Sequence, residues 1–470
     1  MKFPNDFIKQ MRLLLGEEDY EEFITSLQVQ PPSVSIRLND FWKQDDMLFQ
    51  AGTPQCLRKV PWCSSGYYMK QRLTFTFDPL LHAGCYYVQE ASSMFLEQAI
   101  KQYVQQPVIM LDLCAAPGGK STHTQSLLPE GSLLVANESV RNRSHILSEN
   151  ITKWGHPDVV VTNNVPEDFA PLDNFFDVIL ADVPCSGEGM FRKNAKAIDE
   201  WSLENVELCR RRQQNIISDI WTCLKPDGIL IYGTCTYNTR ENEENIAWIQ
   251  QNFGAETLPL NVSEQWNITG SLKQHTSPVY RFMPHKTEGE GYFLTILRKP
   301  SSTSCSSKKN KKKTHLPASF SKTHFVESEQ WLAASGNYQL LVKGSSIIAF
   351  PENYINELTL LEQTLRIVQS GTAIAEIKGK DLIPQHALAM SGLLCREAFP
   401  VEEVGYKQAI AYLRKETVSL STNSALGYVL VLYKGVPLGF VKNISSRVNN
   451  LYPHEWRIRS QHLPEEIRIL

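Results

Sequence analysis

Two cysteines each follow a predicted buried strand, and each lies in a short polar loop. Cys185 comes directly after Pro184, and Cys235 comes directly after Thr234. A loop at the end of a strand can present a thiol to a substrate, and the thiolate form of cysteine is a strong nucleophile. The chain therefore offers two candidate nucleophiles, and their positions alone leave open which of them reacts.

A carboxylic acid lies close to the first of these thiols. Asp182 ends the same apolar run that precedes Cys185, and open parallel sheets bind ligands at the carboxyl ends of their strands. Carbon C5 of cytosine becomes nucleophilic when a thiolate adds to C6 and an acid is hydrogen-bonded at N3 and the 4-amino group. The stretch lacks the Asp/Asn-Pro-Pro-aromatic loop typical of adenine amine methylation. A thiol beside an acid therefore favours chemistry at carbon.

A glycine-rich turn forms a candidate nucleotide cradle. Residues 111–122 follow one predicted strand and open a predicted helix, and Gly118 and Gly119 let the backbone approach a ligand. Lys120 and the helix N-terminus add positive potential. The spacing fits neither the GxxxxGK[ST] nor the GxGxxG pattern. Glu138 ends the next apolar strand about 20 residues beyond Gly118, the place of a carboxylate that binds ribose hydroxyls.

The elements that must position these residues alternate between strand and helix. Such alternation is typical of an α/β domain with a parallel sheet. Apolar runs predict its strands at residues 108–113, 132–138, 158–163, 176–182 and 228–234. Outside this region, the patterns predict short strands at residues 34–40 and 66–70, a hairpin at residues 338–350 and a strand-rich segment at residues 426–443.

Composition limits the class of protein. The chain has 470 residues, a 42% hydrophobic content and a formal net charge of -3, which predicts several domains and excludes coating of nucleic acid by bulk charge. Its ten cysteines show no metal spacing, so we expect reduced thiols and no metal, with Cys209 and Cys223 as buried apolar side chains on a helix. The N-terminus predicts an amphipathic helix and no run has membrane-spanning length, so we expect a cytoplasmic protein without a membrane partner.

A Ser- and Lys-rich stretch from Lys299 to His315 lacks apolar periodicity and predicts a linker. Its run Lys308–Lys313 is interpreted as solvated chain, and salt-sensitive phosphate contacts are the alternative.

Three ordered stretches give the chain a resemblance to a known family. LDLCAAPGGKST (residues 111–122), DVPCSGEGMFRK (182–193) and GTCTYNTRENEEN (233–245) together resemble the RNA cytosine-5 methyltransferases of the NOL1/NOP2/Sun family. The similarity extends over about residues 35–298, and the tail resembles the RNA-binding, PUA-like end of a bacterial 16S rRNA methyltransferase. It implies a Rossmann-like fold, S-adenosyl-L-methionine as cofactor, and 16S rRNA or the 30S subunit as partner. It implies no DNA partner, and we expect a monomer.

The resemblance also implies residue roles. Cys235 would be the nucleophile, Cys185 would assist product release, and Asp182 would contact the base and lie beside the cofactor. Glu138 would bind the ribose, and Arg143 matches a basic residue that follows it. The family's cofactor loop falls on Cys114, Ala115, Ala116, Pro117, Gly118, Gly119 and Lys120.

Some positions leave alternatives open. DNA cytosine-5 methyltransferases use the Pro-Cys thiol, so spacing does not decide between the two cysteines. A helix capped by Asn238 after Cys235 would lower the pKa of that thiol. Val165 stands where many relatives have an aspartate near the adenine, and Asp168 is a nearby substitute. Lys193 matches a basic residue for phosphate or active-site contact, with a solvated lysine as the alternative.

In the tail, the candidate RNA contacts lie in the module that resembles an RNA binder, with core packing as the alternative for the tyrosines. These candidates are Tyr433, Lys434, Lys442, Tyr452 and Arg457.

The predicted organisation has five parts, and the tail is expected to be self-contained. They are an N-terminal α+β RNA-binding domain (1–83), a methyltransferase domain (84–298), a linker (299–317), a first C-terminal α+β domain (318–395) and a PUA-like RNA-binding domain (396–470). The favoured function is methylation of cytosine C5 in 16S rRNA. The alternatives are a tRNA cytosine-5 methyltransferase and a ribosome-assembly factor that acts by binding rRNA. The target nucleotide stays open.

Overall fold

A nine-stranded mixed sheet forms the centre of the computed structural model, which describes residues 1–42, 58–272, 275–301, 322–333, 337–460 and 466–470. The strand order is β10-β12-β9-β8-β5-β6-β7-β15, and β11 pairs with β12. The apolar runs form its parallel part, as predicted: β5 (Ile109–Asp112), β6 (Leu133–Asn137), β7 (Val159–Thr162), β8 (Phe176–Asp182) and β9 (Leu224–Thr234).

Antiparallel strands extend this sheet at both ends, which the prediction of a parallel sheet did not include. They are β10 (Glu256–Leu258), β11 (Tyr280–Phe282), β12 (Tyr292–Arg298) and β15 (Ile367–Ser370). β12 pairs with β9, whereas β15 comes from the C-terminal part of the chain and pairs with β7.

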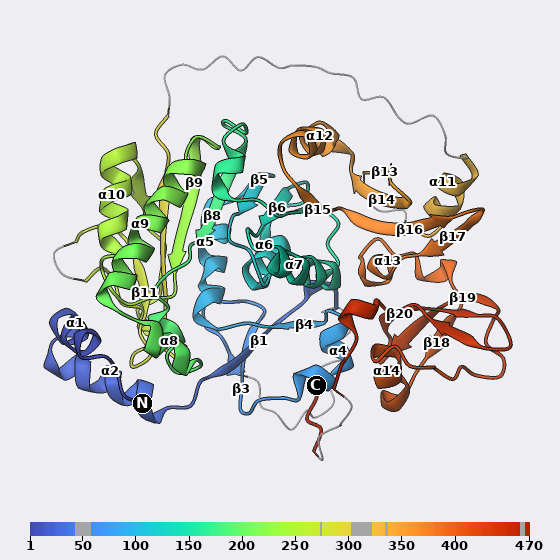
Figure 1. Cartoon of the computed structure of the whole chain (residues 1–470), viewed down its shortest axis with the longest axis horizontal. Helices are drawn as coiled ribbons and strands as arrows, with labels where there is room; N and C mark the ends of the chain where they lie inside the picture. The colour runs from blue at the N-terminus through green and yellow to red at the C-terminus, as the bar shows by residue number, and fades with distance from the viewer. Residues whose placement is uncertain (43–57, 273–274, 302–321, 334–336, 461–465) are drawn as a thin grey trace.

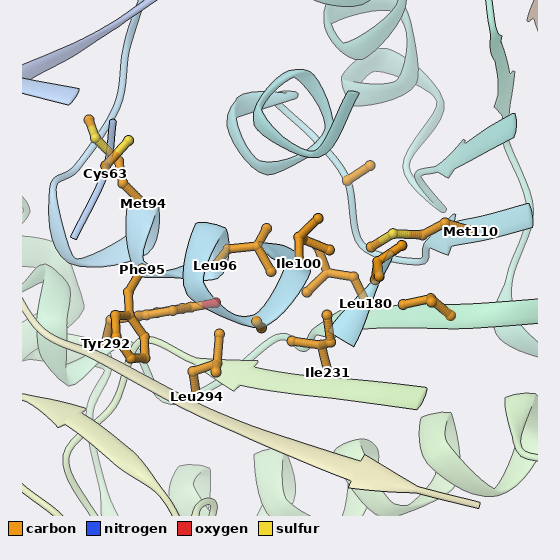
Figure 2. Close-up of a cluster of buried hydrophobic side chains, with 14 of the residues drawn as sticks. Cys63, Met94, Phe95, Leu96, Ile100, Met110, Leu180, Ile231, Tyr292 and Leu294 are labelled. Atoms are coloured by element: carbon orange, nitrogen blue, oxygen red, sulfur yellow. The ribbon is translucent and has the colours of Figure 1, made fainter. Parts of the chain in front are cut away.

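Helices cover both faces of the sheet because its strands are apolar on both sides. On β5, Met110 packs into one hydrophobic cluster and Leu111 into the other. The first cluster includes side chains of α5 (Leu96–Tyr103), α6 (Gly119–Leu127) and α7 (Arg141–Trp154); the second includes α9 (Leu203–Ile220), α10 (Glu243–Phe253) and α12 (Ile355–Thr364). Figure 2 shows Leu96 and Ile100 of α5 beside Leu180 and Ile231 in the first cluster.

The N-terminal part consists of two helices and a small antiparallel sheet. α1 (Asn5–Leu15) and α2 (Glu17–Val29) are separated at Gly16, where a single amphipathic helix was expected. The sheet has the order β2-β3-β1-β4, with β1 (Val34–Leu38), β2 (Arg58–Lys59), β3 (Gly66–Met69) and β4 (Tyr86–Val88). The short helix α8 (Ala195–Glu200) belongs to the central part of the chain, after β8. α4 (Pro79–His82) precedes β4.

The N-terminal helices reach the loop that carries the first cysteine. Phe7 of α1 and Phe23 of α2 pack in one cluster with Phe191, Trp201 and Tyr237. Figure 1 shows α1 and α2 close to α8. The N-terminal helices therefore support the two cysteine loops.

Two four-stranded sheets make up the C-terminal part. The first holds the predicted hairpin and has the strands β13 (Tyr338–Lys343), β14 (Ser346–Pro351), β16 (Thr372–Lys378) and β17 (Asp381–Pro384). The second has the strands β18 (Val401–Glu403), β19 (Gly427–Tyr433), β20 (Val436–Asn443) and β21 (Val448–Asn450). Their helices are α11 (Lys322–Glu329), α13 (His386–Met390) and α14 (Tyr406–Leu413).

The tail is not self-contained, which corrects the expectation from the linker. Ile36 of β1 and Tyr86 of β4 share one hydrophobic cluster with Ile410 and Val431 of the tail. The backbone N–H of Leu470 donates to Asp78, the residue that caps α4, and Figure 1 shows the C-terminus near this helix. Deleting the tail would expose this shared core, because its apolar side chains lie on both sides of the contact.

The linker prediction lies largely outside the described residues, since residues 302–321, with the run Lys308–Lys313, are not among them. Among the described residues the cysteines are free, and no helix is long and apolar enough to cross a membrane. Cys209 is buried on α9, and Cys223 is buried just beyond the end of that helix.

Candidate active site

The two cysteines meet at the carboxyl edge of the central sheet. Their loops follow β8 and β9, which are parallel neighbours. The Cys185 Sγ lies 3.0 Å from the Cys235 Sγ, and the backbone N–H of Cys235 donates to the Cys185 Sγ at 3.3 Å. Tertiary structure thus places both predicted thiols at one point.

The electrostatics of this pair separate the two thiols. The hydrogen bond with Cys235, followed by burial, raises the pKa of Cys185 well above its usual value. Two thiolates at this separation would repel each other, so the pair holds at most one negative charge. Cys185 therefore keeps its proton near neutral pH.

The predicted helix contact of Cys235 is wrong. α10 begins at Glu243, and its N-cap is Asn242 rather than Asn238. The Asn238 side chain instead accepts from the backbone N–H of Glu241 at 2.9 Å and so closes a turn before the helix. Because the field of a helix N-terminus acts mainly over its first turn, α10 begins too far along the chain to act on the thiol of Cys235.

Asp182 forms an ion pair that the sequence did not indicate. Its Oδ2 lies 2.8 Å from the Nζ of Lys120, in the first turn of α6. Burial lowers the pKa of Lys120, but the charge and hydrogen bond of Asp182 together with Tyr292 and Asp112 outweigh burial, and the net shift is upward. Lys120 also lies over the ring of Tyr292, 5.1 Å from its centroid. The cofactor loop and the first cysteine loop are thus joined by one partly buried charge pair.

The glycine-rich turn lies between β5 and α6 as predicted. Gly118 is the N-cap of α6 and has a φ of 116°, a left-handed conformation that favours glycine. Two side chains of α7 hold the turn from outside: Arg143 donates to the carbonyl of Ala116 at 2.8 Å, and Asn150 donates to the carbonyl of Pro117 at 2.7 Å. These bonds leave the N–H groups at the start of α6 available to a ligand.

The first residues of this turn are enclosed. Ala115 is buried, and its N–H donates to the carbonyl of Asn137 at 2.8 Å. Burial raises the pKa of Cys114 far above its usual range. Cys114 therefore stays a neutral thiol.

Glu138 lies where the ribose carboxylate is expected, directly after β6. It is 3% exposed, and its Oε1 accepts from the backbone N–H of Val140 at 2.9 Å. Arg143 lies 3.4 Å from its Oε2. Arg143 thus contacts both Glu138 and the glycine-rich turn, and it holds the two predicted cofactor-binding segments together.

The turn after β7 carries Val165 at the position where many relatives have an aspartate. Val165 is exposed, and its N–H donates to the Oδ2 of Asp168 at 3.1 Å. This bond closes the turn after β7, so Asp168 is engaged with its own loop.

Two polar groups beside the turn were missed by sequence reasoning. The Oδ1 of Asp112 and the hydroxyl of Tyr292 are buried and have no hydrogen-bond partner in the described part of the chain. Burial raises the pKa of Asp112 to about 7, although the hydrogen bond from Ser121 opposes this shift. The end of an apolar strand was an available signal for Asp112; Tyr292 is far away in sequence, on antiparallel β12. Unsatisfied buried groups of this kind are suited to a polar ligand.

The remaining predicted contact residues have partners or packing of their own. Lys193 lies 3.6 Å from Glu290, which also binds Arg192 at 2.7 Å. In the tail, Tyr433 and Tyr452 are buried, in agreement with the core-packing alternative.

The cations of the tail have local partners. Lys434 donates to the carbonyl of Leu470, and Arg457 donates to that of His454. Lys442 lies over the ring of Tyr428 at 4.9 Å. Partial exposure of these side chains leaves room for a further contact.

A separate buried cluster contains Cys63, Glu97 and His123, whose donor atoms lie within 4.8 Å of one another. The His123 Nε2 lies 3.2 Å from Glu97 and 3.6 Å from the Cys63 Sγ. Burial lowers the pKa of His123 to about 4, so its ring is neutral and can donate to Glu97. Hydrogen bonding accounts for these contacts.

The strand order, with antiparallel β12 beside β9, and the turn after β5 define a Rossmann-like methyltransferase. A family model described as 16S rRNA methyltransferase RsmB/F matches residues 101–298, and models of the RsmF N-terminal and PUA domains match residues 3–91 and 399–458. The chain belongs to the RsmF family of 16S rRNA methyltransferases.

Curated relatives agree along nearly the whole chain. The ribosomal RNA small subunit methyltransferase F of Salmonella arizonae is 30% identical over 96% of both chains, and that of Erwinia tasmaniensis is 29% identical over 96% of both. A solved structure of a methyltransferase homolog from Pyrococcus horikoshii is 27% identical, with a TM-score of 0.55 over 63% of this chain and 95% of that one.

Proposed function

We propose that this protein transfers a methyl group from S-adenosyl-L-methionine to C5 of a cytosine in 16S rRNA. The observation that carries the proposal is the pair of thiols 3.0 Å apart beside Asp182 at the carboxyl edge of the sheet. Methylation at C5 needs one thiolate to add at C6 and a group to assist removal of the C5 proton before elimination. Two thiols and an acid at one point suit that sequence of steps.

Within this proposal, the Cys235 thiolate adds to C6 and the Cys185 thiol assists the later elimination. Asp182 contacts N3 and the 4-amino group, and it passes to N3 a proton that the Lys120 ammonium gives up across their 2.8 Å contact. Lys120 holds the Asp182 carboxyl at the edge of the sheet through their 2.8 Å contact. After methyl transfer, water takes the C5 proton, the C6–S bond breaks to restore the thiolate of Cys235, and N3 returns its proton through Asp182 to Lys120.

S-adenosyl-L-methionine supplies the electrophilic methyl group, and the residues present fit this cofactor. The turn from Cys114 to Lys120 offers backbone N–H groups at the start of α6, and Glu138 offers carboxylate oxygens for ribose hydroxyls. The buried Oδ1 of Asp112 has no described partner and adds a further acceptor.

Gly118→Ala is expected to weaken S-adenosyl-L-methionine binding by about tenfold or more, because a left-handed φ costs an L-residue about 1–2 kcal/mol. The added Cβ would also lie 3.3 Å from side-chain atoms of Leu147 and Asn150. Gly119→Val is a less direct probe, since a Cβ at Gly119 would lie 3.2 Å from the ring of Tyr87. Calorimetry measures the affinity.

Gly16→Ala is the matched control for this experiment. Gly16 has a φ of 79° and a ψ of 172°, and a Cβ there meets no atom within 4 Å, so the backbone strain is at least as large but lies between α1 and α2. Its cofactor affinity should equal that of the wild type. Unchanged affinity in folded Gly118→Ala would remove the turn from the cofactor site.

The small-subunit relatives favour 16S rRNA over the two alternatives. Relatives aligned over 96% of this chain carry the name small subunit methyltransferase, whereas a tRNA enzyme is favoured by the shared chemistry alone. A factor that only binds rRNA has no use for the paired thiols. We also propose that the protein acts as a monomer in the cytoplasm and that its chain divides into the four predicted domains and the linker 299–317, with 1–83 and 396–470 contacting RNA.

Bisulfite sequencing of total RNA from a deletion strain tests this function. We expect one or more cytosines of 16S rRNA to lose protection, and the wild-type gene but not its Cys235→Ala form to restore it. Lost protection in tRNA alone would favour the tRNA enzyme, and unchanged protection in every RNA would favour the assembly factor.

Replacing Lys442 and Arg447 by alanine is expected to weaken RNA binding about threefold to tenfold and to lower its salt dependence, because each lost phosphate contact reduces the counterions released. Both residues flank the turn between β20 and β21, and Arg447 is exposed. Affinity for 16S rRNA fragments at several salt concentrations is the measurement. Arg211→Ala, an exposed cation on α9 outside the two parts proposed to contact RNA, is the control. Wild-type affinity and salt slope in the double variant would exclude this hairpin from the RNA contact.

A further inference from the structure

Two buried carboxylates lie between the cysteine loops and have no part in the roles assigned so far. Glu188 belongs to the loop that follows Cys185, and Glu241 belongs to the segment that follows Cys235. Both are 0% exposed. Because neither side chain reaches solvent, neither can contact an RNA base or the cofactor directly.

The Glu188 side chain binds backbone N–H groups of the loop that follows Cys235. Its Oε2 accepts from the N–H of Tyr237 at 2.7 Å and from the N–H of Asn238 at 3.0 Å. Its Oε1 accepts from the side chains of Asn238 at 3.1 Å, Trp201 at 3.0 Å and Gln10 at 3.0 Å. Both oxygens of Glu188 thus accept hydrogen bonds from N–H groups, and one of these groups, that of Gln10, lies on α1.

Glu241, which lies after Cys235, likewise accepts hydrogen bonds from the loop that carries Cys185. Its Oε2 accepts from the backbone N–H of Ser186, the neighbour of Cys185, at 3.0 Å, and its Oε1 accepts from the Ser186 hydroxyl. The side chains of Gln213 on α9 and Asn238 donate to it at 2.7 Å and 2.8 Å. Gln213 also donates to the carbonyl of Pro184 at 3.0 Å, which ties the first cysteine loop to α9.

We propose that Glu188 and Glu241 are positioning residues that hold the two cysteine loops together and so set the separation of Cys185 and Cys235. Each carboxylate belongs to one loop and binds the backbone N–H groups of the other. The loops also touch directly, since the N–H of Gly189 donates to the carbonyl of Cys235 at 2.9 Å. The two carboxylates bridge the same pair of loops in addition to this Gly189–Cys235 contact.

The chemistry of the contacts requires carboxylates rather than amides. Hydrogen bonds from donors to a carboxylate are stronger than those between neutral groups. Both oxygens of Glu188 and of Glu241 face donors, so either orientation of a glutamine would place an NH2 group against another donor. Glu188→Gln and Glu241→Gln therefore keep the side-chain volume but break the contact between the loops.

The meaning of this arrangement for catalysis rests on the proposed function, in which both thiols act on one base. A change of about 1 Å in the position of a reacting group costs about 100-fold in rate. We therefore expect kcat of each glutamine variant to fall about 100-fold, while KM for RNA and the affinity for S-adenosyl-L-methionine stay at wild-type values.

Formation of a disulfide between the two thiols tests the positioning without any RNA. Diamide takes up the two thiol hydrogens, and the sulfurs, now 3.0 Å apart, form the S–S bond. Mass spectrometry of peptides from the intact protein follows the Cys185–Cys235 cross-link with time. We expect each glutamine variant to cross-link about tenfold more slowly than the wild type, because the thiols spend less time within reach.

Asp78→Asn is the matched control. Asp78 is also a fully buried carboxylate that accepts from backbone N–H groups, those of Leu80 and Leu470, but it lies in the N-terminal part. It should cross-link at the wild-type rate. An equal slowing in Asp78→Asn would mean general loosening of the fold and would overturn the proposal.

A milder change covers the case in which the glutamine variants do not fold. Ser186→Ala removes the hydroxyl donor to Glu241, together with the contacts of that hydroxyl to Thr236 and Asn238, and keeps the backbone N–H that binds Glu241. It is expected to slow cross-linking about threefold. Wild-type cross-linking in the folded glutamine variants, or in Ser186→Ala if those do not fold, would refute the positioning role. Since the cross-link involves neither RNA nor methyl transfer, failure of the proposed methylation leaves this result interpretable.

Discussion

Cys235→Ala is expected to give neither methylated RNA nor a covalent RNA–protein adduct, with activity reduced by a factor of about 10⁴ or more. Without the thiolate, nothing adds to C6 and C5 does not become nucleophilic. A denaturing gel detects the adduct as a band shifted by the mass of the RNA, and incorporation of labelled methyl groups detects the product.

Cys185→Ala is expected to block the last step of the reaction, the elimination that releases the RNA. Attack by Cys235 and methyl transfer can proceed, but the elimination loses the thiol that lies 3.0 Å from the departing sulfur of Cys235. The enzyme should therefore stay bonded to its RNA, and the shifted band should accumulate. The raised pKa of Cys185 agrees with this assignment, because a thiol that keeps its proton is a poor nucleophile.

Cys395→Ala serves as the control for loss of a thiol, since Cys395 is a free, partly exposed cysteine of the tail. It should leave both product and adduct levels unchanged. An adduct with Cys235→Ala and none with Cys185→Ala would reverse the two roles and make the site resemble that of the DNA enzymes.

Asp182→Asn is expected to suppress both product and adduct, with a rate lower by about 10² to 10⁴, the usual contribution of a positioned acid. An amide cannot supply the proton that the addition places at N3. The same substitution leaves the partly buried Lys120 ammonium without its carboxylate, and this loss costs up to about 3 kcal/mol of unfolding free energy. Rate measurements and thermal unfolding together separate the two effects.

The double variant Asp182→Asn, Lys120→Met distinguishes lost chemistry from lost stability. It removes the unpaired charge, so the free energy of unfolding should recover towards that of the wild type while adduct formation stays suppressed. Adduct formation at the wild-type rate in either variant would exclude Asp182 as the acid.

The parallel strands and most of the chemical groups could be predicted because they depend on local patterns. Five apolar runs were long enough to identify β5 to β9, and the end of a parallel strand is a known place for ligand groups. The antiparallel strands were missed since β10, β11 and β15 are short. β15 joins the sheet across the linker from the tail, and no local pattern encodes such a pairing.

The site shows the same division. Residue type and position along a strand indicated Cys185, Cys235 and Asp182, because a nucleophile and an acid are recognisable from their chemistry. The partners of these groups were not recognisable: the ion pair of Asp182 with Lys120 joins loops from two different strands. The helix expected after Cys235 was placed too early, since Asn238 closes a separate turn.

By itself, the amino-acid sequence determined the groups available for the reaction and the strands that end beside them, because both follow from residue type and short-range periodicity. Only the tertiary structure decided which groups touch. It brought two thiols to 3.0 Å, placed Glu188 and Glu241 between their loops, and packed the tail against the N-terminal sheet. These contacts join residues far apart in the chain, and their distances are set by packing of the whole sheet and its helices, which no local pattern specifies.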